Sequence, residues 1–241
     1  MKVLTVYARI YADALRQALA GIGKNAWTLL LPIGLFVGGR FVLQFLVSVL
    51  GGIPIVASIV AGLLLCAVVS CYLYFVGEIV AKSRVKLDEF GRSVGAYFWS
   101  VANLLFVYWI ATLVIGLIGP GTGFAFDELL WWASVILLNA SPEVIYQRGS
   151  HGGLETVQRS IKFLQANWIE WGIPNLLVVG AWYYLRHESR LVDQYVPPLL
   201  LAVLEGALVH VVMVFRGHLF AALDGSSHRQ RMYRYRSSGA V

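Results

Sequence analysis

Charged residues are scarce in this chain of 241 residues. Asp, Glu, Lys and Arg make up 13% of it, whereas hydrophobic residues make up 59%. A soluble protein usually has about 25% charged residues, so this chain has too few to cover a water-soluble globule of its size. The scarcity argues against an ordinary soluble protein, and the mean hydropathy of +0.71 favours a membrane protein with a single integral membrane domain.

Sequence motifs for catalysis or metal binding are also lacking. The only two cysteines, Cys66 and Cys71, would lie on different sides of a helix, which predicts buried thiols rather than a disulfide or a metal site. There is no Gly-rich loop ending in Gly-Lys-Ser/Thr and no His-Glu-x-x-His motif. Serines such as Ser58 and Ser70 have no suitably placed His or Lys within the apolar stretches. We therefore predict no catalytic residues, no metal site and no cofactor.

What the chain does contain is a set of six long apolar stretches. A hydrocarbon core about 30 Å thick requires about 20 mostly apolar residues in a helix, and backbone amides in lipid must find partners within the protein. The fold class that this predicts is all-α, a polytopic membrane protein with six transmembrane helices. The predicted spans cover approximately residues 25–50, 53–80, 97–118, 127–147, 167–185 and 196–220.

The distribution of basic residues predicts the orientation. With the N-terminus placed in the cytoplasm, only Arg186 and Arg190 fall on the outside and Arg40 falls within the first span, while every other Lys and Arg falls inside. Cytoplasmic loops carry an excess of Lys and Arg. We therefore predict a multi-pass protein of the cell inner (cytoplasmic) membrane with both termini in the cytoplasm.

A threefold internal repeat precedes the first, third and fifth predicted spans. Residues 13–19, 88–94 and 155–161 align without gaps, each beginning with an acid: Asp13, Asp88 and Glu155. Copies one and three continue to match beyond this block, with Asn25 over Asn167, Pro32 over Pro174 and Gly38 over Gly180. A fixed period implies one structural unit used several times. We predict three transmembrane hairpins, at approximately residues 1–82, 83–150 and 151–222, followed by a basic cytoplasmic tail at 223–241.

Each repeat begins with an amphipathic segment. Apolar residues three or four positions apart share one helical face, with charges opposite, which predicts a helix lying in the cytoplasmic interface. The alternative is that the segment extends the following span into water. The apolar residues are Leu4, Tyr7, Tyr11, Leu15, Leu19 and Ile22; Leu87, Phe90, Val94 and Tyr97; and Leu154, Val157, Ile161, Leu164 and Trp168.

The second half of the chain resembles a known bacterial pattern. Gly119-Pro120-Gly121 precedes an apolar span, which ends in the run from Ala140 to Ile145, and Gly149 then precedes the block 157–167. In these features the chain is similar to the YciC-like inner-membrane proteins and to the membrane domain fused to some glycerophosphodiester phosphodiesterases. The resemblance implies a fold and no catalytic residues. No phosphodiesterase domain is appended to residues 1–241, so we expect no phosphodiesterase chemistry from them.

Ionisable residues inside the predicted spans are the first candidate functional residues, because charges at that depth are unfavourable. Arg40 in the first span and Glu205 in the last fall at comparable depths, which predicts an intramembrane ion pair between these two helices. The pair would either close the bundle or serve transport. His210, near the middle of the last span, is predicted to be packed and hydrogen-bonded rather than a ligand.

A second candidate lies near the inner end of the fourth span. Pro142 frees a backbone carbonyl and can kink a helix. Glu143 would then face a cytoplasmic vestibule, with Arg148, Arg159 or Glu170 nearby. These residues form either a gate or a helix end paired with interfacial arginines.

The tail mixes arginine with tyrosine. Near an anionic leaflet each basic residue contributes about 1 kcal/mol to binding. We therefore predict that the tail contacts anionic lipid headgroups rather than nucleic acid. The predicted lipid-binding residues are Arg229, Arg231, Arg234 and Arg236.

These features predict a noncatalytic membrane subunit or accessory protein that binds lipid, a membrane-protein partner or a second copy of itself. A transporter or lipid-translocating protein with a path between the repeats is the alternative, and an intramembrane enzyme is a weaker third. Small residues allow helices to pack closely. Those at predicted span positions are Gly38, Gly39, Gly62, Gly116 and Gly206.

Overall fold

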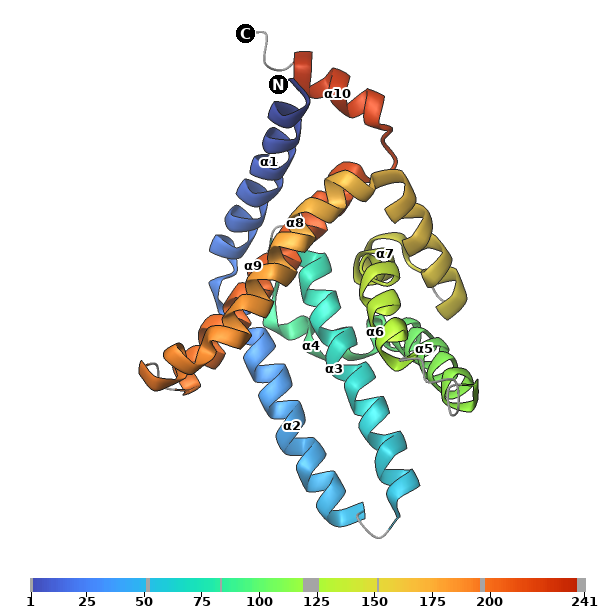
Figure 1. The fold of residues 1–241 in the computed structure, drawn as a ribbon. Helices are drawn as coiled ribbons and strands as arrows, with labels where there is room; N and C mark the ends of the chain where they lie inside the picture. The colour runs from blue at the N-terminus through green and yellow to red at the C-terminus, as the bar shows by residue number, and fades with distance from the viewer. Residues whose placement is uncertain are drawn as a thin grey trace. The chain divides into compact units, whose positions relative to one another are not determined.

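The structure is a computed structural model, and it describes residues 2–50, 53–82, 84–118, 126–150, 152–195 and 198–237. All regular elements in these ranges are helical (Figure 1), which confirms the all-α prediction for the part described. The α-helices are α1 Lys2–Lys24, α2 Leu31–Leu50, α3 Pro54–Lys82, α4 Phe90–Ala96, α5 Phe98–Ile118, α6 Phe126–Leu137, α7 Ser141–Arg148, α8 Gly153–Tyr195, α9 Pro198–Leu223 and α10 His228–Ser237, and the short 3-10 helices are η1 Ala26–Leu30 and η2 Leu87–Glu89.

Proline explains where several helices begin. Pro32, Pro54, Pro142 and Pro198 lie in the first turns of α2, α3, α7 and α9. The first turn leaves its backbone N–H groups without helical partners, so proline is tolerated there, and its fixed φ suits a helix. Pro174 is different because it lies inside α8.

Among the described residues, four helices are long and apolar enough to cross a membrane, as a membrane protein requires. They agree with the first, second, third and sixth predicted spans. A bilayer needs about 20 residues of helix, and each of the four provides at least that length. Their spans are Ala26–Val49, Ile55–Lys82, Phe98–Leu117 and Leu200–Leu223.

The other two predicted spans are not among these four. Residues 127–147 do not form one helix, because α6 ends at Leu137 and α7 begins at Ser141. A turn closes between them, with the amide of Ser141 bonded to the carbonyl of Leu138 at 3.0 Å. The break immediately precedes Pro142, the residue predicted to kink this helix. Residues 167–185 lie within α8, where side chains are described only as far as residue 180.

Each predicted amphipathic segment is separated from the apolar helix after it by a break in helical geometry. Asn25 has φ −134° and ψ 45° between α1 and η1, and Asn167 has φ −134° and ψ 24° inside α8. Tyr97, between α4 and α5, has φ −123° and ψ 11°. The amphipathic segments are thus separate helices rather than straight extensions of the spans.

The chain divides into two compact units that interleave in sequence. Unit 1 comprises Met1–Val42, Phe75–Leu87 and Ala166–Val241, and unit 2 comprises Leu43–Tyr74 and Asp88–Gln165. The boundaries of these units differ from the predicted boundaries of the three repeats. The threefold repeat stays a prediction.

In unit 1, α1 packs along α9 and also contacts α10. Its buried face includes Ile10, Ala14 and Ala18. The predicted apolar face is partly a different one, because Leu4, Leu15 and Leu19 are exposed. The helix therefore has two neighbouring apolar faces, one covered by protein and one uncovered.

In unit 2, hydroxyl groups fix the junction between α4 and α5 to α3. The hydroxyl of Ser70 donates to the carbonyl of Ser93 at 3.1 Å and accepts from the amide of Tyr97 at 2.9 Å. Cys71 is a buried free thiol beside the hydroxyl of Ser93, at 3.0 Å, and Cys66 is also buried and free. This confirms the prediction of two buried thiols.

Glycine allows one close helix contact in the apolar part of unit 1. A Cβ atom placed on Gly206 of α9 would lie 2.7 Å from Cγ1 of Ile33 in α2. By contrast, Gly38, Gly62 and Gly116 would each place a Cβ atom where no atom lies within 4 Å. Of these four predicted packing glycines, the structure supports only Gly206.

We expect Gly206→Ala to destabilise the protein by about 1–3 kcal/mol, because the added methyl group overpacks the contact with Ile33. Gly38→Ala is the matched control, since it meets no neighbour and gains up to about 1 kcal/mol from reduced backbone freedom. Thermal unfolding in detergent, followed by tryptophan fluorescence, measures both. Equal midpoints for the two variants would contradict the close contact.

Candidate functional sites

Unit 1 buries an acid that is bound by two basic side chains. Glu170 of α8 is 4% exposed and Arg231 of α10 is 2% exposed. Oε1 of Glu170 accepts from Nη2 of Arg231 at 3.1 Å, and it lies 3.0 Å from Nδ1 of His228. A buried charge requires such pairing. We call Tyr11, Glu170, His228 and Arg231 the Glu170 cluster.

Arg231 also binds the end of α9. Its Nη1 donates to the carbonyl of Leu223 at 2.9 Å and to the hydroxyl of Ser226 at 3.1 Å, and it contacts the carbonyl of Ser226 as well. The last turn of α9 has no basic residue of its own. The guanidinium therefore supplies the positive charge that a helix C-terminus favours.

Tyr11 joins α1 to the same cluster. Its hydroxyl donates to the backbone carbonyl of Glu170 at 2.9 Å. Burial, and then the nearby Glu170 carboxylate, raise the pKa of Tyr11 to about 12, so the hydroxyl keeps its proton at neutral pH. The cluster thereby ties α1, α8 and α10 together and caps α9.

An aromatic layer adjoins the cluster. Trp171 and Phe220 are both buried and meet edge to face, with ring centroids 6.1 Å apart. The guanidinium carbon of Arg216 lies 5.1 Å from the centroid of a Trp171 ring, within the range of a cation–π contact. These contacts hold α8 against α9 next to Glu170.

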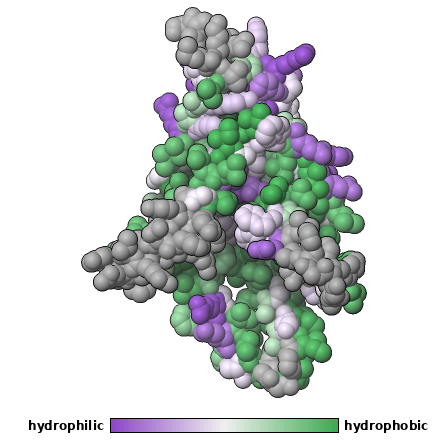
Figure 2. All heavy atoms as spheres, in the orientation of Figure 1, coloured by the Kyte–Doolittle hydropathy of each residue, from purple (hydrophilic) through white to green (hydrophobic). Residues whose placement is uncertain are grey.

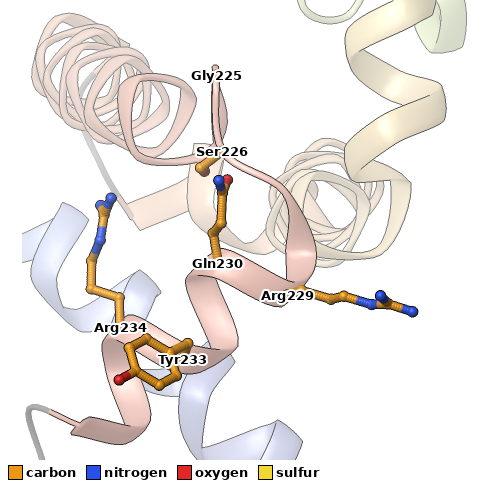
Figure 3. Close-up of a pocket in the computed structure, with 6 residues that line it drawn as sticks. All are labelled: Gly225, Ser226, Arg229, Gln230, Tyr233 and Arg234. Atoms are coloured by element: carbon orange, nitrogen blue, oxygen red, sulfur yellow. The ribbon is translucent and has the colours of Figure 1, made fainter.

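The exposed face of α10 carries two of the predicted lipid-binding residues, Arg229 and Arg234. Arg229, Tyr233 and Arg234 are exposed and line a shallow pocket of about 520 Å³ together with Gly225, Ser226 and Gln230. Figure 3 shows Gln230 pointing toward Ser226, while the side chain of Arg229 extends away from it. This face can present positive charge to an anionic surface.

Arg231 corrects the sequence-based prediction. The sequence predicts that Arg231 binds lipid. The structure shows instead that its side chain is buried and bonded to Glu170, so it lies in the interior. The reason is helical geometry, because Arg229 and Arg231 are two residues apart and so project from different sides of α10. The side chain of Arg236 lies outside the described residues.

The predicted pair of Arg40 and Glu205 has no support among the described contacts. Both side chains are exposed, and no ion pair between them occurs in the described part of unit 1. The two residues lie at comparable depths along their predicted spans. Depth alone does not determine which side of a helix faces its neighbour. The pair stays a prediction.

The prediction for His210 is confirmed. The ring is fully buried, and its Nε2 lies 3.0 Å from the hydroxyl of Thr28. Thr28 in turn donates to the carbonyl of Asn25, at 2.7 Å. The imidazole therefore joins α9 to the break that follows α1.

The predicted gate residues lie in unit 2, and Glu143 is fully buried in the first turn of α7 rather than in an open vestibule. Arg148 and Arg159 come together, because Nη1 of Arg159 donates to the carbonyl of Arg148 at 3.4 Å. Nη2 of Arg159 also pairs with Glu155 at 2.5 Å. With Pro142 beginning α7, this geometry supports the helix-end alternative over the gate.

Sequence reasoning missed the Glu170 cluster, naming Glu170 only as a neighbour of the gate. One available signal was an acid at the start of an apolar stretch, since such a residue needs a partner. The sequence did not indicate which basic residue would supply it. Among the described residues, no three His, Cys, Asp or Glu side chains are grouped so as to hold a metal ion.

Comparison with known proteins found no matching family model, no matching curated protein and no matching solved structure.

We expect Arg231→Ala to destabilise the protein by about 3–5 kcal/mol, because it leaves the buried carboxylate of Glu170 without its arginine. Arg229→Ala, two residues away and exposed, should change stability by less than about 0.5 kcal/mol. Thermal unfolding in detergent and limited proteolysis of the C-terminal helix both report the difference.

Adding Glu170→Ala to Arg231→Ala tests the coupling. Residues in direct contact give non-additive effects, so the double variant should lose less stability than the two single variants together. Strict additivity would contradict a direct interaction between the two residues.

Proposed function

We propose that the protein is a noncatalytic inner-membrane subunit or accessory protein that binds a membrane-protein partner or a second copy of itself, lipid, or both. In this proposal the chain crosses the membrane six times, in three hairpins, with both termini in the cytoplasm. Residues 127–147 cross as the broken pair α6 and α7, and residues 167–185 cross within α8. The YciC-like resemblance is part of the same proposal.

The observation that carries the proposal is the exposure of apolar span surfaces. In each of the spans that contain α2 and α5, only 11% of the residues in the most apolar stretch are buried. On α2, Phe41 and Phe45 are 68% and 67% exposed. Figure 2 shows apolar side chains over much of the visible surface where α2 and α3 lie. Apolar patches of this extent mark contact with lipid or with another protein.

The three-repeat arrangement is supported by matching burial at aligned positions. Ala18, Ser93 and Ser160 occupy one position of the repeat, and all three are fully buried. Asn25 and Asn167 occupy another, are both buried and both break their helices. Parallel repeats of this kind occur in membrane proteins.

The interfacial position of α1 is supported by its three different faces. One face packs on α9, and a second carries exposed Leu4, Leu15 and Leu19. Arg9 and Arg16 lie beyond the second face and are exposed. Protein, lipid and water would then each meet a different side of the helix, as in an interfacial helix.

The alternative of a transporter requires a polar route through the membrane. Neither of the two pockets characterised in the described residues is lined by Arg40, Glu143 or Glu205. His210 is bonded to Thr28 inside unit 1. This bond joins two segments of unit 1, which favours a structural role for His210.

Photo-crosslinking from α2 tests the binding role. A photoreactive amino acid at Phe41 or Phe45 should give covalent adducts to a second protein or a second copy in intact cells, because both side chains are exposed and apolar. The same group at Val214, which is fully buried, is the control and should give none. Adducts to lipid alone, with a monomer in mild detergent, would contradict the subunit role.

Cysteine labelling tests the orientation. In a Cys66→Ser, Cys71→Ser background, we expect Lys24→Cys and Arg229→Cys to react with a membrane-impermeant maleimide only after the cells are opened, since basic segments stay in the cytoplasm. Labelling of either site in intact cells would overturn the proposed topology.

A further inference from the structure

We propose that a groove on unit 2 binds an aminophospholipid, with an acyl chain along α5 and the headgroup at the start of α8. The groove has a volume of about 550 Å³, within the range of about 300–1,000 Å³ usual for small-molecule sites. We call it the α5 groove. Its lining includes Phe106, Val107 and Ile110 of α5 and Gly153, Leu154 and Glu155 of α8. The proposal rests on the lipid-binding part of the proposed function.

The apolar part of the groove runs along a membrane span. Phe106, Val107 and Ile110 follow one another at spacings that keep them on one face of α5, and Phe106 and Ile110 are exposed. Leu154, which is 66% exposed, adds the first turn of α8. Because α5 is one of the four apolar spans, this strip would lie at the depth of the acyl chains.

One wall of the groove depends on glycine. A Cβ atom on Gly153 would overlap the backbone carbonyl of Asn103 and would lie 2.8 Å from Cγ2 of Val107. The start of α8 therefore lies directly against the backbone of α5. This contact places the polar groups of α8 at one end of the apolar strip.

That polar end carries one charge of each sign. Glu155 lines the groove and is paired with Arg159 at 2.5 Å, and both side chains are partly exposed, at 44% and 36%. Arg159 also donates to the carbonyl of Arg148, so its guanidinium is held at this end.

An aminophospholipid headgroup has the complementary arrangement of charge. Its ammonium group would bind the carboxylate of Glu155, and its phosphate would bind the guanidinium of Arg159, for which arginine geometry is well suited. A phospholipid thus satisfies both the apolar strip and the paired charges. A helix from a partner protein would match the strip alone, so the charges favour the lipid.

Native mass spectrometry of the full-length protein in detergent tests the groove. After delipidation, added phosphatidylethanolamine should bind to the wild type as a discrete adduct. Ile110→Trp and Phe106→Trp fill the groove and should each lower the adduct fraction at least fivefold. Leu113→Trp is the matched control, because Leu113 is similarly exposed on α5 but does not line the groove. Equal binding by all three variants would overturn the site.

The headgroup is tested separately. Glu155→Gln should weaken phosphatidylethanolamine binding and leave phosphatidylglycerol binding unchanged, because only the first lipid has an ammonium group. Equal wild-type affinity for both lipids would overturn the assignment to an aminophospholipid. A protein that fractionates with membranes but binds no lipid in the groove would refute this inference and leave the proposed membrane role standing. A protein that is monodisperse without detergent would refute both.

Discussion

Backbone amides in a hydrocarbon layer have no water to bond, so each must find its partner inside the same segment. This constraint explains why the apolar stretches of the chain are helices and why the breaks between them matter. At Asn25 the side-chain amide donates to the carbonyl of Gly21 at the end of α1 at 2.8 Å, and its oxygen accepts from the amide of the distant Val85 at 2.9 Å. The break therefore becomes a point of attachment between segments.

Polar side chains in this protein serve chiefly as joints between helices. His210 meets Thr28, Ser93 meets α3, and Ser160 donates to the carbonyl of Leu137 at the end of α6 at 2.7 Å. The Glu170 cluster also joins helices, but it does so through charged groups. The outer surfaces of the spans carry exposed apolar side chains. The proposed role is therefore contact with lipid and protein rather than catalysis.

Sequence reasoning succeeded where a property depends on composition along one helix. The four apolar spans, the buried thiols and the bonded His210 all follow from local pattern. It failed where a property depends on the direction of a side chain or on a distant partner. Glu170 and Arg231 are 61 positions apart, and nothing local indicates that Arg231 turns inward while Arg229 turns outward. The break before Pro142 was anticipated as a kink, but not as the end of one helix and the start of another.

Every proposed role of this protein requires that these helices lie in lipid. Hydrogen–deuterium exchange of the protein in lipid nanodiscs measures this directly. The amides of Phe98–Leu117 and Ala26–Val49 should be strongly protected, while those of α10, whose outer face meets water, should exchange faster. Rapid exchange throughout Phe98–Leu117, in a protein that is otherwise folded, would contradict the account.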